Sequence, residues 1–119
     1  MKATNGVIEY KNREYKLVFN LNSMEQIQEE YGSIDKWGEL TDGTDENNGE
    51  PNIKALVFGL TVMLNEGIEI DNEEKGEDIK PFTKKQVGRI VSEIGLQEAL
   101  NTMNNTVIES TKSDNEKNE

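Results

Sequence analysis

The acidic segment that starts at Asp71 has residue types that could bind calcium. Asp71, Glu73 and Gly76 fall on positions 1, 3 and 6 of an EF-hand loop. The twelfth position of such a loop needs a bidentate carboxylate, but here it is Phe82, which cannot coordinate the ion. The acidic segment at 41–50 offers no register in which ligands, glycine and terminal Glu all fit. We therefore predict two solvated loops and no metal site.

The amino acid composition excludes much other catalytic chemistry. The 119 residues contain no histidine and no cysteine. The usual general base, the commonest metal ligand and the thiolate nucleophile are therefore missing, and so is a disulfide scaffold. With 24 acidic residues, a pair of carboxylates carries no information unless a pocket holds it. Glycine-rich phosphate-binding loops are absent. We predict that the protein is not an enzyme, with no catalytic residues and no cofactor.

The charge balance disfavours nucleic acid and membranes as partners. The 13 basic and 24 acidic residues give a net charge of -11, which repels phosphate backbones and anionic lipids. We interpret the one basic cluster, within 80–89, as a solvent-exposed face. The longest apolar stretch, 53–64, covers about 12 positions with interruptions, whereas a membrane span needs about 20. Residues 1–6 lack the features of a signal peptide, so we expect a cytoplasmic protein.

A β-hairpin is predicted over residues 7–19, where two β-prone runs flank a polar centre. Placing Asn12 and Arg13 at the turn gives one apolar and one charge-paired face. In this register the facing pairs are Tyr10 with Tyr15, Ile8 with Leu17, Glu9 with Lys16, and Lys11 with Glu14. Because a lone hairpin is marginally stable in water, its apolar face must pack on helices.

Helices are predicted along most of the remaining chain. Ser23 with Gln26, and Thr83 with Gln86, are capping boxes that indicate helix starts, and glycines indicate helix ends. The predicted helices cover 23–31, 33–40, 51–66, 83–94 and 96–107, with Pro51 in the first turn of the third and Gly67 as its cap. An alternating pair, Ile68 and Ile70, then leads into the acidic loop. We predict Trp37 as core, with an interface anchor as the alternative.

These elements predict a single α+β domain: a mostly α-helical small bundle with an N-terminal β-hairpin. We place the globular domain at residues 1–109. Residues 110–119 contain no apolar side chain, so this acidic tail cannot offset the entropy cost of ordering. We predict that the tail is disordered.

The predicted helix at 51–66 is apolar on nearly every face. Such a helix is either central in the fold or covered by a second molecule, and both interpretations stay open. Periodicity places Phe58, Val62 and Met63 on the face that the fold needs least. We therefore predict these three as partner-binding residues; methionine suits varied partner surfaces. A spare apolar face is also compatible with a homo-oligomer when the partner is absent.

Several segments together resemble tail assembly chaperones of long-tailed, siphovirus-type phages and prophages of Gram-positive bacteria. The matching segments, spread over residues 7–112, are YKLVFN at 15–20, MEQIQEEYGS at 24–33, MLNEGIEID at 63–71, PFTKKQVG at 81–88 and ESTK at 109–112. None of them is a catalytic signature, and the similarity is one of overall pattern.

The resemblance implies a non-catalytic chaperone in the host cytoplasm that is absent from the mature virion. Such a protein coats and solubilises the tape-measure protein and helps to recruit tail-tube subunits. In many relatives a programmed ribosomal frameshift adds a domain that binds the tube protein, and this chain would then be the shorter product. The charge suggests an alternative: an acidic nucleic-acid mimic or inhibitor that binds a basic DNA-handling protein.

Overall fold

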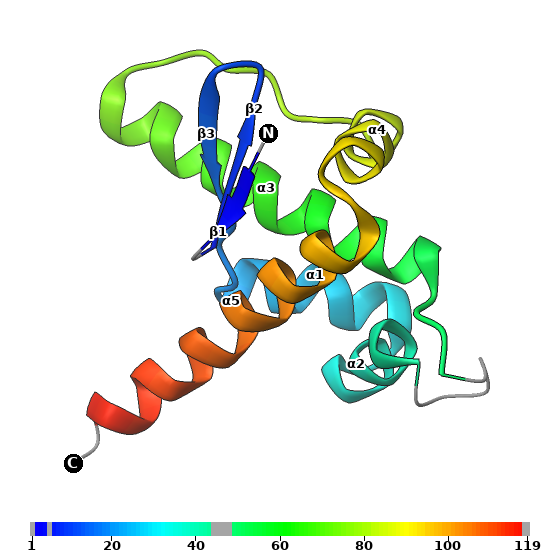
Figure 1. Ribbon diagram of the computed structural model, residues 1–119. Coiled ribbons are helices and arrows are strands. Elements are labelled where there is room, and N and C mark those ends of the chain that lie inside the picture. Colours follow the sequence, from blue (N-terminus) through cyan, green and yellow to red (C-terminus); the bar gives the residue numbers. More distant parts are fainter. Residues whose placement is uncertain (1, 5, 44–48, 118–119) are drawn as a thin grey trace.

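The computed structural model describes the backbone of residues 2–4, 6–43 and 49–117 and the side chains of 6–43 and 49–110. Figure 1 shows a small antiparallel sheet packed on a group of helices, so the predicted α+β, mostly helical fold is confirmed. The strands are β1 (Lys2–Thr4), β2 (Val7–Tyr10) and β3 (Arg13–Lys16), in the order β1-β2-β3. The helices are α1 (Leu21–Tyr31), α2 (Ile34–Asp42), α3 (Ile53–Lys75), α4 (Lys84–Ile94) and α5 (Leu96–Lys117).

The hairpin of β2 and β3 forms, but the predicted register is wrong. Lys11 and Asn12 occupy the turn with φ of 52° and 64°, the left-handed values that a tight two-residue hairpin turn requires. Ile8 therefore pairs with Tyr15, and Tyr10 with Arg13. The register differs from the predicted one by two residues, so every side chain stays on its predicted face. The third strand, β1, was not predicted.

Helix α1 starts earlier than its predicted cap at Ser23. Asn20 is the N-cap, and its side-chain oxygen accepts a hydrogen bond of 3.1 Å from the Ser23 backbone N–H. Ser23 is buried, and its hydroxyl donates to the Val18 carbonyl at 2.6 Å. The serine thus satisfies a core carbonyl instead of capping the helix. Gly32 ends α1 as predicted.

Helix α2 begins after its N-cap Ser33, as predicted, and extends into the segment that was predicted to be a loop. Thr41, from that segment, is buried. The centre of the predicted loop, 44–48, lies outside the described residues. The core prediction for Trp37 is confirmed: its indole N–H donates to the Ala55 carbonyl at 3.0 Å, and its ring stacks on Phe19.

Helix α3 is the central element, and it is longer than predicted. Asn52 caps it, so Pro51 precedes the first turn, and the helix continues past Gly67 to a cap at Gly76. The alternating pair and the first part of the predicted acidic loop, through Lys75, are therefore helical. Figure 1 shows α3 crossing the molecule, with β3, α1, α2, α4 and α5 packed against it. Of the two interpretations that the sequence left open, the central position is correct.

Gly67 lies where α3 crosses β3. A Cβ atom on Gly67 would overlap the carbonyl oxygen of Lys16. The glycine that was predicted to end the helix instead permits close approach between helix and strand. The Val18 N–H donates to the Met63 carbonyl at 3.2 Å one turn earlier along α3.

The capping box at Thr83 and Gln86 is confirmed at the start of α4, and Gly95 forms the corner to α5. The α5 backbone continues through Lys117, so it crosses the predicted boundary after residue 109 without a break. Ser110 donates a hydrogen bond of 2.8 Å to the Phe19 carbonyl, which ties α5 to the segment between β3 and α1.

Candidate functional site, a groove between α1, α2 and α5

The predicted partner-binding residues are not together at the surface. Met63 is fully buried and Val62 is only 6% exposed, because neighbouring elements cover α3. Phe58 is half-buried: its ring meets the edge of Tyr31 at a centroid distance of 5.5 Å, and Lys84 Nζ lies 5.1 Å from its centre. The expectation that the fold leaves this face of α3 open is therefore wrong for Val62 and Met63.

Besides Ile53 at the start of α3, the exposed large apolar side chains of the described residues lie on α1 and α5. Leu21 on α1 is 80% exposed, and Ile108 on α5 is 57% exposed. Each of the two lines a pocket of about 470 Å³, and the pockets adjoin because Ile34 lines both of them. We call this combined surface the α1–α2–α5 groove. Its apolar lining residues are Leu21, Met24, Ile34, Trp37, Val107 and Ile108.

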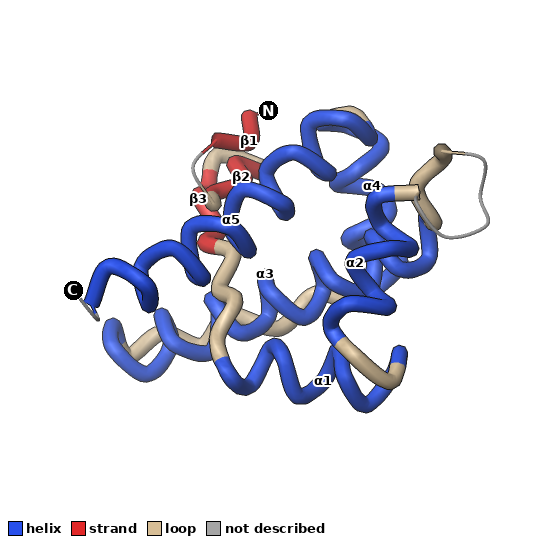
Figure 2. Tube along the Cα trace, turned by 90° about the horizontal axis from the view of Figure 1, so that it is seen from below, coloured by secondary structure: helices blue, strands red, loops and turns tan. Residues whose placement is uncertain are grey.

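Figure 2 shows that α1 and α2 meet at a corner. The middle turns of α5 complete the pocket on α2 through Asn104, Val107 and Ile108. The short α1–α2 connection at Gly32 and Ser33 places Ile34 at that corner. Successive turns of α5 present Asn104 and Ile108, which lie four residues apart and therefore on one helix face.

Hydrogen bonds fix the walls of the groove to the core. Asn20 Nδ2 donates to Glu66 of α3 at 2.8 Å, which secures the start of α1. The Asn52 N–H donates to the Leu40 carbonyl at 2.8 Å and secures α2, next to the Trp37 indole bond. The Ser110 hydroxyl secures α5. Since each wall is held independently of any partner, the groove is formed in advance, which lowers the entropy cost of binding.

The charged residues that line the groove are all acidic. Its acidic lining residues are Glu25, Asp35, Glu39 and Asp42, all exposed. Among the described residues that line the two pockets, none is Lys or Arg. An apolar surface with an acidic edge is typical of a protein-binding site.

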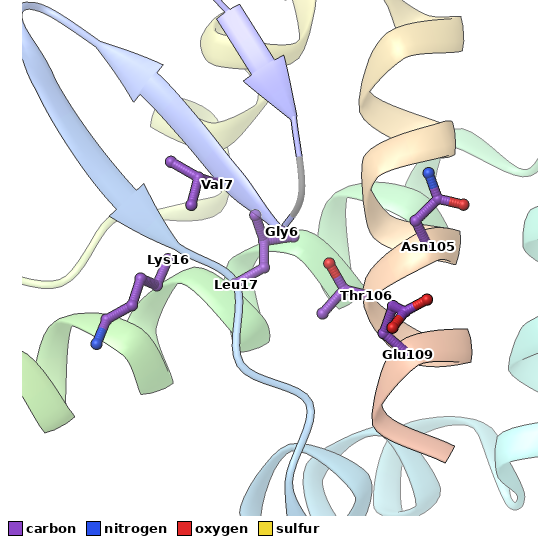
Figure 3. A pocket seen from close by; sticks show the side chains of 7 residues that line it. All are labelled: Gly6, Val7, Lys16, Leu17, Asn105, Thr106 and Glu109. Carbon is purple, nitrogen blue, oxygen red and sulfur yellow. The ribbon is translucent and has the colours of Figure 1, made fainter. Parts of the chain in front are cut away.

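A larger pocket, of about 670 Å³, lies between the base of the hairpin and α5 (Figure 3). In Figure 3 the Lys16 side chain points away from α5; its ammonium pairs with Asp71 at 3.1 Å. The Thr106 hydroxyl, which faces the hairpin, donates to the Thr102 carbonyl at 2.8 Å. These two lining side chains therefore make structural contacts.

The segment with partial calcium-site spacing is also structural. Asp71 lies within α3, where its carboxylate pairs with Lys16. Nearby, Arg13 contacts Glu77 at 2.8 Å, and this hydrogen bond raises the pKa of the guanidinium. Within the described part of the chain, no three acidic side chains converge as they would around a metal ion. These ion pairs join the hairpin to the end of α3.

The sequence contained only weak signals for the groove. Leu21 precedes Ser23, the predicted helix start, so it fell outside every predicted apolar stripe. Ile108 follows Val107 directly, and the predicted stripe of the last helix ended with Val107. Two adjacent apolar residues on a helix widen its apolar stripe, so the helix can contact the core and a second surface. The width of the stripe at Val107 and Ile108 was therefore the one sequence signal for the groove.

Comparisons with known proteins identify no relative. No protein-family model matches the chain, and no curated protein and no solved structure is significantly similar to it. None of the helices in the described ranges has the length and apolarity of a membrane span.

Proposed function

We propose that this protein is a non-catalytic tail assembly chaperone that coats the tape-measure protein of a long-tailed phage and keeps it in solution. In this role it works in the host cytoplasm, helps to recruit tail-tube subunits and leaves the finished tail. The preformed α1–α2–α5 groove is the observation that carries the proposal, because it offers an apolar surface to a partner. The sequence resemblance supplies the identity of that partner.

The groove suits a helical partner. Amphipathic helices bind apolar grooves through side chains spaced three and four residues apart. Two adjoining pockets that share Ile34 could each receive one such side chain. A very long helical protein with apolar stripes would aggregate without a cover, and many copies of a small acidic protein would give it a charged exterior. The net charge of -11 fits that task.

The test is co-expression with the long protein encoded downstream of this one. We expect the long protein to remain soluble and to co-purify with the chaperone. Ile108→Asp should abolish its recovery in the soluble fraction, because it places a charge in the groove. Ile53→Asp is the matched control, since Ile53 is 53% exposed and lines neither pocket of the groove.

Circular dichroism should give the same helix content for both variants and the wild type, since both positions are at the surface. The proposal fails if the long protein precipitates in the presence of the wild-type chain. It also fails if both variants keep the long protein in solution as well as the wild type does, because the groove would then have no role.

A further inference from the structure

We infer that the segment bound in the α1–α2–α5 groove is an amphipathic helix whose apolar stripe is flanked by lysine or arginine. This inference rests on the proposed function and specifies the chemistry of the partner segment. It follows from the distribution of charge around the groove, which the proposed function does not use.

The acidic residues lie beside the apolar lining, where they would face the flanks of a bound helix. Asp35, Glu39 and Asp42 follow one another along α2, and all three line the pocket that contains Ile108. Glu25 lines the adjoining pocket on α1. A helix with its apolar stripe in the groove would bring its flanking residues next to these carboxylates. Lysine or arginine at those flanks would pair with them, whereas acidic flanks would be repelled.

The same charges disfavour a second copy of this chain as the occupant. Each copy carries a net charge of -11, and both would bring acidic helices to the contact. Repulsion between like charges at close range opposes such a dimer. A cationic partner helix has no such penalty, and its approach is accelerated by the opposite charge.

Three synthetic peptides of about 18 residues, each five helical turns long, test the inference. The first has leucines at helical spacing and lysine flanks, and the second has the same leucines with glutamate flanks. The third has the composition of the first in scrambled order. We expect the first to bind, with an affinity that falls at high salt because rim charges are screened. The second and third should bind at least tenfold more weakly.

The tryptophan in the groove reports where the peptide binds. Trp37 is the only tryptophan in the sequence and lines the groove, so a peptide without tryptophan leaves its emission unobscured. A bromophenylalanine in place of one leucine can quench that emission if the peptide lies against the indole, because heavy-atom quenching requires close contact. Trp37 is only 2% exposed, so this result is read together with peptide binding to Ile108→Asp. Binding that shows no quenching and that Ile108→Asp leaves unchanged would place the peptide elsewhere and overturn the inference.

A pair of triple variants separates local charge from net charge. Glu25→Gln, Asp35→Asn and Asp42→Asn together should weaken lysine-flanked binding about fivefold to tenfold, as expected for three exposed charge pairs. The control variant combines Glu73→Gln, Glu74→Gln and Asp78→Asn, exposed positions near the end of α3 that lie outside the groove. It removes the same charge and should leave the affinity nearly unchanged. Equal weakening by both variants would show non-specific attraction and overturn the inference.

These outcomes are distinguishable from those of the proposed function. If the long protein is kept in solution but lysine-flanked and glutamate-flanked peptides bind equally, the inference fails and the proposed function stands. If the lysine-flanked peptide binds and quenches while the long protein precipitates, the proposed function fails and the groove chemistry stands. The wild type could instead self-associate and bind no peptide. If Ile108→Asp abolishes this self-association, a second copy is the occupant and the inference is overturned.

Discussion

Replacement of Gly67 by alanine tests the close packing of α3 on β3. The added methyl group would meet the Lys16 carbonyl oxygen, which belongs to the strand backbone and cannot rotate away. Either the helix or the hairpin must shift, and overpacking of this kind costs about 1–3 kcal/mol. We take the upper part of that range because the obstacle is backbone. Alanine also favours a helix over glycine by about 1 kcal/mol, so the expected net loss is about 2 kcal/mol of unfolding free energy.

Gly88→Ala in α4 provides the matched control. Gly88 is also helical, and a Cβ atom there would meet nothing within 4 Å. This variant should therefore gain about 0.5–1 kcal/mol through helix propensity alone. Thermal and urea unfolding of the two variants, followed by circular dichroism, give both values. For a domain of this size the Gly67 variant should melt about 8 °C lower than the wild type. If it is as stable as the Gly88 variant, the described contact between α3 and β3 is refuted.

Three further predictions concern the core and its boundary. Gly59→Ala should destabilise the fold by about 1 kcal/mol in urea unfolding, because its methyl group would overlap the Trp37 indole; the indole is a side chain and can shift in part, so the loss is smaller than at Gly67. Asn20→Ala should cost about 1–2 kcal/mol in the same assay, since it removes the N-cap of α1 and the bond to Glu66; no loss would contradict the assigned cap. Burial raises the pKa of Tyr31 above its ordinary value of 10.0, and the charge of Glu30 raises it further. The folded state therefore keeps the Tyr31 proton to a higher pH than the unfolded state does. The contribution of this group to the free energy of unfolding is full below pH 10 and is lost as the pH rises through the folded pKa. The wild type should accordingly lose more stability than Tyr31→Phe between about pH 9 and 11, and identical pH profiles would contradict this assignment.

The sequence predicted the fold class and most of the helices because those depend on local signals. The capping box at Thr83 and Gln86 and the glycines that end α1 and α4 act through neighbouring backbone groups. Such signals keep their meaning wherever the helix packs.

The errors occurred where a residue has more than one structural use. Gly67 has the residue type of a helix cap, yet its role depends on a strand about 50 residues earlier in the chain, which no local pattern reveals. Ser23 similarly has the type of an N-cap, but its hydroxyl is used by the Val18 carbonyl. The hairpin register depended on Lys11, a residue that sequence rules do not favour in a left-handed conformation.

The candidate site could not be predicted for a related reason. Periodicity identifies the apolar faces of one helix, but the remaining elements decide which of those faces they cover. Five elements pack around α3, and they bury Val62 and Met63. The groove instead consists of one pocket between α1 and α2 and an adjoining one between α2 and α5, and the relative placement of three helices is a tertiary property. Its acidic edge was visible in the sequence only as part of the net charge.

The position of α5 in the chain determines when the groove can exist during synthesis. The hairpin, α1, α2 and α3 leave the ribosome first, and α3 gives the hairpin a surface on which to pack. The wall that carries Ile108 and the Ser110 bond to Phe19 belong to α5 and emerge after them. A nascent chain that stops before α5 therefore lacks one side of the groove. Ribosome-bound intermediates should therefore lack the complete groove until α5 has docked.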